Sequence, residues 1–181
     1  MTTTPLDGVT DFVAGLPELA QPLIVAALGM IPYVEGEGSA AIGIVVGINP
    51  IVAALAGAVG NILSVIAVVL LSSRVRESVV TRRASSADGG GVAVLEHEPV
   101  EGTETRRAKG RKRLSAWLVR YGVPGASILA PLALPTQFTA AFLVASGVRK
   151  GWVLLWQVVA IVLWTALVAA IALGLVTLFG A

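Results

Sequence analysis

The feature that most constrains this chain is the near absence of charge from two long apolar stretches. Only three charged residues lie between Leu16 and Leu71, and from Tyr121 to the end only Arg149 and Lys150 are charged. About 20 consecutive apolar residues are enough for a helix to cross a bilayer. The whole chain is 56% hydrophobic and 13% charged, against roughly 25% charged in soluble domains. The sequence therefore predicts an all-α membrane protein.

Proline and glycine divide each stretch into a broken segment and a continuous one. The first broken segment, 22–48, has MIPYVEGEGS at its centre and is followed by the continuous run 50–72. The second, 117–147, is interrupted by APLALPTQFT and is followed by 151–180. Proline removes a backbone donor and glycine weakens a helix. Each half is therefore predicted to be a proline-broken hairpin followed by a transmembrane helix.

Two further segments complete the predicted organisation. Residues 1–20 place apolar side chains at helical spacing with acids between them, which predicts an amphipathic helix at the membrane interface. Residues 73–115 consist of a flexible tract, an acidic tract and a basic tract. Such a segment cannot bury enough apolar surface to fold alone, so a flexible loop is predicted. The two repeats then comprise residues 21–72 and 116–181.

The distribution of Lys and Arg predicts the orientation in the membrane. Eleven of the 13 basic residues lie between Arg74 and Arg120, and the others are Arg149 and Lys150. Basic residues accumulate in cytoplasmic loops, so we expect a plasma-membrane protein with the loop 73–115 in the cytoplasm and the N-terminus outside. Two re-entrant hairpins keep every basic residue inside and give the two halves inverted orientations. The alternative, in which both broken segments cross fully, puts Arg149 and Lys150 outside.

The two breaks hold the polar residues that can carry a function. Glu35 and Glu37 lie in the first break, and Thr136 and Gln137 lie in the second. Carboxylates at membrane depth are usually proton relays or ligands, and breaks in corresponding places of two inverted halves indicate a transporter's binding site. We predict that these four residues bind protons and solute; the alternative is that the glutamates lie at the headgroup level and are simply solvated. The residues predicted to break the helices are Pro32, Gly36, Gly38, Pro131 and Pro135.

Other classes of function find no support in the sequence. There is no cysteine, and the one histidine, His97, lies between two acids in the polar loop, which is a poor metal site. No nucleophile with a positioned base, phosphate-binding glycine loop or zinc spacing is present. We therefore expect no enzyme activity, no cofactor and no metal. Because the basic residues lie where they fix topology, no nucleic-acid partner is expected either.

The broken segments also carry a family resemblance. The chain contains GMIPYVEGEGSAAIGIVVGINP, AGAVGNIL and YGVPGASILAPLALPTQFTAAFLVASGV, which together cover most of it outside the loop and the tail. In these stretches it resembles the small multidrug export family, which is distantly similar to the DedA (VTT-domain) membrane proteins. The resemblance implies inverted repeats with re-entrant hairpins and proton-coupled transport. The DedA-like proteins add the carriage of polyprenyl phosphate as a further possibility.

Two departures from these families bear on the substrate. The export family often has Glu-x-Arg-Gly before the first Ile-Pro, where this chain has Ala26 and Leu28. The DedA pattern places arginines around its second proline, where this chain has Leu132 and Phe138. Without arginine a phosphate has no bidentate partner. A cationic or neutral solute suits the two glutamates better.

These observations lead to one main expectation and two alternatives. We expect a proton-coupled exporter of a cationic or neutral small solute, working as a homodimer because two spanning helices and two hairpins are too few to enclose a path. The first alternative is a DedA-like flippase of a polyprenyl-phosphate lipid, which would need Arg120, Arg149 or Lys150 at the site. The second is a non-transporting membrane scaffold whose long loop recruits a partner.

Overall fold

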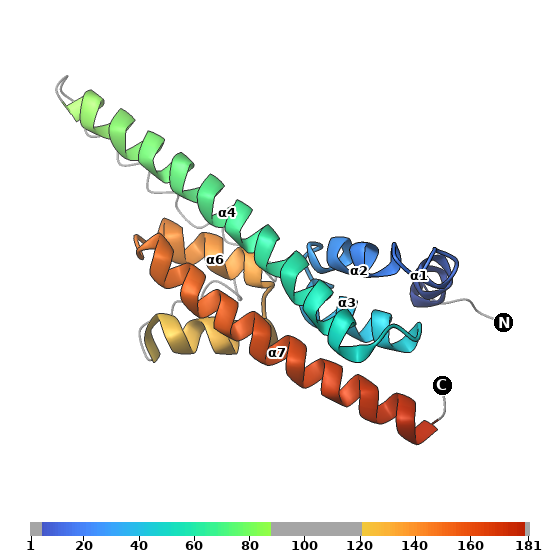
Figure 1. Ribbon diagram of the computed structural model, residues 1–181. Coiled ribbons are helices and arrows are strands. Elements are labelled where there is room, and N and C mark those ends of the chain that lie inside the picture. Colours follow the sequence, from blue (N-terminus) through green and yellow to red (C-terminus); the bar gives the residue numbers. More distant parts are fainter. Residues whose placement is uncertain (1–4, 88–120, 180–181) are drawn as a thin grey trace, which may run out of the picture.

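The computed structural model describes residues 5–87 and 121–179 (Figure 1). Within these ranges the chain is helical and contains no strand, so the predicted all-α class is confirmed. A helical segment also covers residues 121–129. The other elements are α1 (Pro5–Ala14), α2 (Gln21–Gly29), α3 (Glu35–Val45), α4 (Pro50–Ala87), the 3-10 turn η1 (Ala130–Leu132), α6 (Thr136–Ala145) and α7 (Lys150–Phe179).

Two helices, α4 and α7, are long and apolar enough to cross a membrane. The apolar part of α4 is Pro50–Val75, of 26 residues, and α7 has 30 residues. Only 33% of the most apolar window of α4 and 28% of that of α7 is buried inside the protein. Most of their apolar surface therefore faces outward, as on helices that face lipid.

The two long helices lie side by side and run in opposite directions (Figure 1). Ala53 near the start of α4 packs in one cluster with Ala169 near the end of α7. Val69, farther along α4, packs with Val153 near the start of α7. This antiparallel pair is the frame on which the shorter helices lie.

Each long helix is preceded by a pair of short helices that turns back on itself (Figure 1). The pair α2 and α3 packs on α4, and the segment 121–129 with α6 lies toward the opposite end of the molecule. The elements of the two halves start at similar intervals, because α3 starts at 35 and α6 at 136, while α4 starts at 50 and α7 at 150. Both halves therefore follow the same order of elements.

The turns from α3 to α4 and from α6 to α7 have the same conformation. Gly47 has φ of 97° and Gly147 has φ of 92°. Each donates its backbone N–H over 3.0 Å, Gly47 to the carbonyl of Ile44 and Gly147 to that of Val144. Glycine adopts this left-handed conformation without the penalty that a Cβ would bring. The same chain reversal thus leads from each short helix into the long helix that follows it.

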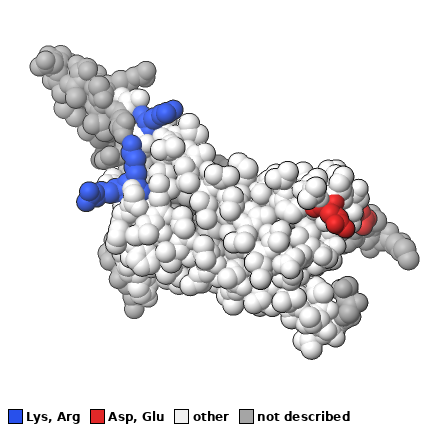
Figure 2. Space-filling view, viewed as in Figure 1, with Lys and Arg blue, Asp and Glu red and all other residues white. Residues whose placement is uncertain are grey.

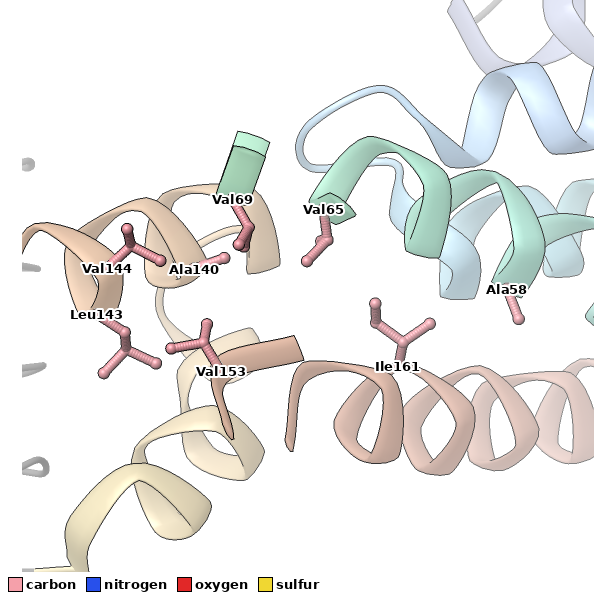
Figure 3. Packing of buried hydrophobic residues seen from close by; sticks show 8 residues of the cluster. All are labelled: Ala58, Val65, Val69, Ala140, Leu143, Val144, Val153 and Ile161. Carbon is pink, nitrogen blue, oxygen red and sulfur yellow. The ribbon is translucent and has the colours of Figure 1, made fainter. Parts of the chain in front are cut away.

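The largest apolar cluster lies between α4, α6 and α7 (Figure 3). A second cluster joins α3 to the start of α4 and the end of α7, so the antiparallel pair is held along most of its length. Leu143 and Ile161 are the largest fully buried apolar side chains. The members of the first cluster are Ala58, Val65, Val69, Ala140, Leu143, Val144, Val153 and Ile161.

Glycines bring α2 and α3 unusually close to α4. A Cβ at Gly60 would overlap the carbonyl oxygen of Ala26 in α2, and a Cβ at Gly57 would lie 2.5 Å from Oγ of Ser39 in α3. Small residues allow such backbone contact between helices in membrane proteins. The glycines of α4 therefore fix how deeply the first helix pair is seated.

One predicted boundary is wrong. The loop expected from residue 73 does not start there, because α4 continues to Ala87. Residues 73–87 contain neither glycine nor proline, and adding residues to an existing helix is much easier than starting one. The remainder of the predicted loop, with His97, lies outside the described residues.

Charged side chains gather at the two ends of the molecule. Figure 2 shows Lys and Arg at one end and Asp and Glu at the other. Arg74 lies at the end of the apolar part of α4 and is exposed, as are Arg149 and Lys150 at the start of α7. The exposed acids Asp11 and Glu18 belong to α1 and the turn after it. These exposed charges therefore lie at opposite ends of the molecule.

Candidate functional site

The break between α2 and α3 covers residues 30–34 and includes Pro32. Two residues with side chains adopt positive φ at its end, Tyr33 with 74° and Glu35 with 53°. This conformation is uncommon for residues other than glycine and is found at turns and functional sites. The chain therefore enters α3 through a constrained turn that ends on a carboxylate.

The residues that were predicted to break the helices differ in where they lie relative to the helices. Pro131 lies in η1, and Pro135 is the residue that precedes α6. Gly36 and Gly38, contrary to the prediction, lie in the first turn of α3 and do not interrupt it. Close packing explains Gly36, because a Cβ there would lie 2.5 Å from Oγ1 of Thr165 in α7.

The two broken segments meet through Glu35 and Thr136. The backbone N–H and the hydroxyl of Thr136 both donate to Oε1 of Glu35, each over 2.6 Å, although the residues are 101 positions apart. The residue before α6, Pro135, offers no side-chain cap. The Glu35 carboxylate instead occupies this helix N-terminus, where the orphan N–H groups and the helix dipole favour negative charge.

The contact continues into α4 as a buried hydrogen-bond network. Nε2 of Gln137 donates to Oδ1 of Asn61 over 3.2 Å and to Oγ of Ser64 over 2.9 Å. Oγ1 of Thr136 lies 3.1 Å from Oδ1 of Asn61. A hydroxyl has one proton to donate, so Thr136 serves either Glu35 or Asn61 at a given moment. The network therefore links α3, α6 and α4.

Several buried polar atoms of α3, α4 and α6 have no partner within the described part of the chain. They are Oε2 of Glu37, Nδ2 of Asn61 and Oε1 of Gln137, all buried. Oγ1 of Thr165, beside the first turn of α3, is also buried and unpaired within those ranges. An unmade hydrogen bond to a buried group costs about 1–3 kcal/mol. Such atoms indicate a place where water or a solute binds.

A second polar contact holds the segment 121–129 on α7. Nε2 of Gln157 donates to Oγ of Ser127 over 3.3 Å, and Nε1 of Trp164 donates to the carbonyl of Ile128 over 2.9 Å. Gln157 and Ser127 are fully buried. These bonds position the second helix pair, as the glycines of α4 position the first.

The structure brings together most of the predicted site and adds two residues to it. Glu35, Thr136 and Gln137 lie in one network, and Glu37 lies two residues further along the first turn of α3. The added residues are Asn61 and Ser64, which the sequence analysis did not assign to the site. The sequence does contain a feature that could have identified them, because both are polar and lie three residues apart in the apolar part of α4.

We expect Thr136→Val to lower the free energy of unfolding by about 1.5–3 kcal/mol, because it removes a short hydrogen bond to a carboxylate. Thermal unfolding in detergent measures the effect, and Thr177→Val, at an exposed hydroxyl of α7, is the matched control. In a Glu35→Ala background, which lacks the acceptor, the loss should shrink, and a double-mutant cycle detects this. An equal loss in both backgrounds would show that the two side chains are not coupled.

The function has to be argued from this site, because a fold class alone does not define an activity. The chain matches no protein-family model, no curated protein and no solved structure.

Proposed function

We propose that this chain is a small secondary membrane transporter that couples protons to the export of a cationic or neutral small solute. One observation carries the proposal. The buried carboxylate of Glu35 lies where two broken segments meet, next to Asn61 near the middle of the apolar span Pro50–Val75. A carboxylate at such depth is expensive unless it binds protons, ions or substrate.

The proposal includes a membrane arrangement. In it α4 and α7 cross the bilayer, and the two short helix pairs are re-entrant hairpins of inverted repeats. The antiparallel long helices, their starts at 50 and 150, and the matching turns that precede them all support it. Broken helices are tolerated at membrane depth where protein buries them or where they line a wet cavity.

The orientation that we propose puts the basic end in the cytoplasm and the N-terminus outside the plasma membrane. Arg74, Arg149 and Lys150 are all exposed toward one end of the molecule, where they satisfy the positive-inside rule together. Full crossings of both broken segments would instead separate Arg74 from the other two.

Cysteine labelling tests this orientation, since the chain has no cysteine of its own. We expect a membrane-impermeant maleimide to label Glu18→Cys in intact cells, and to label Arg74→Cys and Arg149→Cys only after permeabilisation. All three positions are exposed, so access to the reagent depends on the side of the membrane. Labelling of Arg149→Cys in intact cells would support two full crossings instead.

The coupling that we propose works by competition at the tips of the two hairpins. The glutamates bind either protons or the solute, and the neutral groups of Thr136 and Gln137 complete the site. Release of the Glu35 contact with α6 would let the two tips separate. A homodimer is part of the proposal, because one copy has too few helices to surround a path.

The polyprenyl-phosphate alternative has less support. Arg149 and Lys150 belong to the basic end of the molecule, and Arg120 lies outside the described residues. At the tips, Glu35 occupies the N-terminus of α6, and Glu37 lies in the first turn of α3. Helix N-termini that already hold carboxylates have little left to offer a phosphate. The scaffold alternative rests on the loop and gives no role to the buried network.

Proton-driven counterflow in liposomes tests the proposal. Purified protein is assayed with a panel of lipophilic cations and a short-chain polyprenyl phosphate, and internal pH is followed. Cation movement coupled to protons is the expected result. Movement of the lipid instead would establish the flippase, and silence toward the whole panel would contradict transport of either class.

A further inference from the structure

We infer that Asn61 is a positioning residue for the proton that Glu35 carries, because it accepts the hydrogen bond that Thr136 is free to donate once Oε1 of Glu35 is protonated. The inference rests on the proposed function and deepens it, since it names the residue of α4 that supports the protonated form of this carboxyl group. It is carried by the position of the Thr136 hydroxyl between two acceptors.

The hydrogen bonds of Ser64 assign the orientation of the two buried amides. The hydroxyl of Ser64 donates to the backbone carbonyl of Asn61 over 3.0 Å, so toward Gln137 it accepts. Gln137 therefore presents Nε2, which also lies 3.2 Å from the side chain of Asn61. Asn61 has to accept there, so it presents Oδ1, as the assignment of an amide from its network requires. The same oxygen lies 3.1 Å from Oγ1 of Thr136.

The hydroxyl of Thr136 therefore lies between two acceptors. Oε1 of Glu35 is 2.6 Å from Oγ1 on one side, and Oδ1 of Asn61 is 3.1 Å from it on the other. When Glu35 is ionised, the hydroxyl donates its single proton to the carboxylate, because hydrogen bonds to charged groups are the stronger ones. Oγ1 and Oδ1 then face each other without a proton between them. The ionised form thus leaves the contact with Asn61 unmade.

A proton on Oε1 of Glu35 completes the row of hydrogen bonds. Oε1 then donates to Oγ1 of Thr136, and Thr136 donates to Oδ1 of Asn61. Oε1 still offers a lone pair to the backbone N–H of Thr136. Thr136 and Asn61 are both fully buried, so a hydrogen bond that is missing there is costly. Asn61 therefore supports the protonated form, while the N-terminus of α6 supports the ionised form. Glu35 can exchange a proton and keep its contact with α6.

Few other titratable groups belong to the elements around Glu35. Among the described residues, α2 and α6 carry none, α4 carries none before Arg74, and α7 carries none after Lys150. The titratable residues of α1, of the break and of α3 are Asp7, Asp11, Tyr33 and Glu37. Because Glu37 lies two residues from Glu35 and has the same charge, the two can titrate together. A test has to observe Glu35 separately.

Infrared difference spectroscopy of the full chain in detergent provides that test, because a protonated carboxyl group has a carbonyl stretch that a carboxylate lacks. The band that Glu35→Gln removes and Glu37→Gln retains belongs to Glu35. Asn61→Leu removes an acceptor that only the protonated form uses. We expect this variant to need a proton concentration about 5-fold higher to reach half of the Glu35 band. Its monodisperse behaviour is checked first.

Ser64→Ala tests the assigned orientation with a smaller change. Without the Ser64 hydroxyl both amides can turn, so that Asn61 donates to Thr136 and no longer favours the protonated form. The Glu35 band should again need more protons, by a smaller factor than in Asn61→Leu. Ser73→Ala is the matched control, because the Ser73 hydroxyl also donates to a carbonyl three residues earlier in α4, over 2.8 Å, but lies outside the network. This pair is decisive even if Asn61→Leu does not fold.

The outcomes separate this inference from the proposed function. An unchanged titration in Asn61→Leu would place the proton on Oε2 of Glu35, and a shift to higher pH would make Asn61 a donor. Either result would overturn the inference and leave the exporter in place. If Glu35→Gln removes no band at any pH at which the protein is folded, the inference and the proton-binding role of Glu35 both fail. Counterflow that fails while the shift is present would refute transport and leave the role of Asn61.

Discussion

Glu35→Gln is expected to abolish proton-coupled movement of solute, with the initial rate falling at least about 100-fold. Oε1 of the glutamine can still accept the two hydrogen bonds that Thr136 now donates to Glu35, so the contact between the broken segments should survive. The amide cannot bind and release a proton in the physiological range. The variant therefore separates the structural role of this side chain from its chemical role.

The measurement is solute-driven proton release in liposomes, at equal amounts of inserted protein. Glu18→Gln is the matched control, because it makes the same change at an exposed acid outside the site, and it should keep the wild-type rate. Thermal unfolding of Glu35→Gln shows whether the fold is retained. Coupled export that persists after Glu35→Gln and Glu37→Gln together would refute the role proposed for this pair.

The order of elements could be predicted from the sequence because it depends on local signals. Proline and glycine within the two apolar stretches mark the breaks, and the long apolar runs mark α4 and α7. The end of α4 could not be found in this way, because residues 73–87 are polar and yet contain no residue that stops a helix. The prediction that Gly36 and Gly38 break a helix also failed, because glycine can serve packing instead. Gly36 packs closely against Thr165 of α7.

The candidate site was only partly predictable, because its geometry depends on contacts between distant segments. Glu35, Thr136 and Gln137 could be proposed from polarity at the breaks alone. The pairing of Gln137 with Asn61 and Ser64 joins residues that are 76 and 73 positions apart. No local sequence pattern indicates that Asn61 and Ser64 of α4 lie beside the two breaks. Asn61 was therefore not assigned to the site, although it is a polar residue in the apolar part of α4.

Gly60→Ala should destabilise the protein strongly, by about 3 kcal/mol. The added Cβ would overlap the carbonyl oxygen of Ala26, which belongs to the backbone of α2 and cannot rotate away as a side chain can. Relief requires α2 to move away from α4. Because α2 leads into the break that holds Glu35, such a shift should also disturb the contact with Thr136.

Gly174→Ala is the matched control for this prediction. Gly174 also lies in a long apolar helix, but a Cβ there meets no atom within 4 Å. Alanine favours a helix over glycine by about 0.8–1.0 kcal/mol, so this variant should be as stable as the parent or slightly more so. Unfolding in a denaturing detergent measures both. If Gly60→Ala gains stability as Gly174→Ala does, then α2 and α4 are not in backbone contact at Gly60, and the first helix pair is seated less deeply than the structure places it.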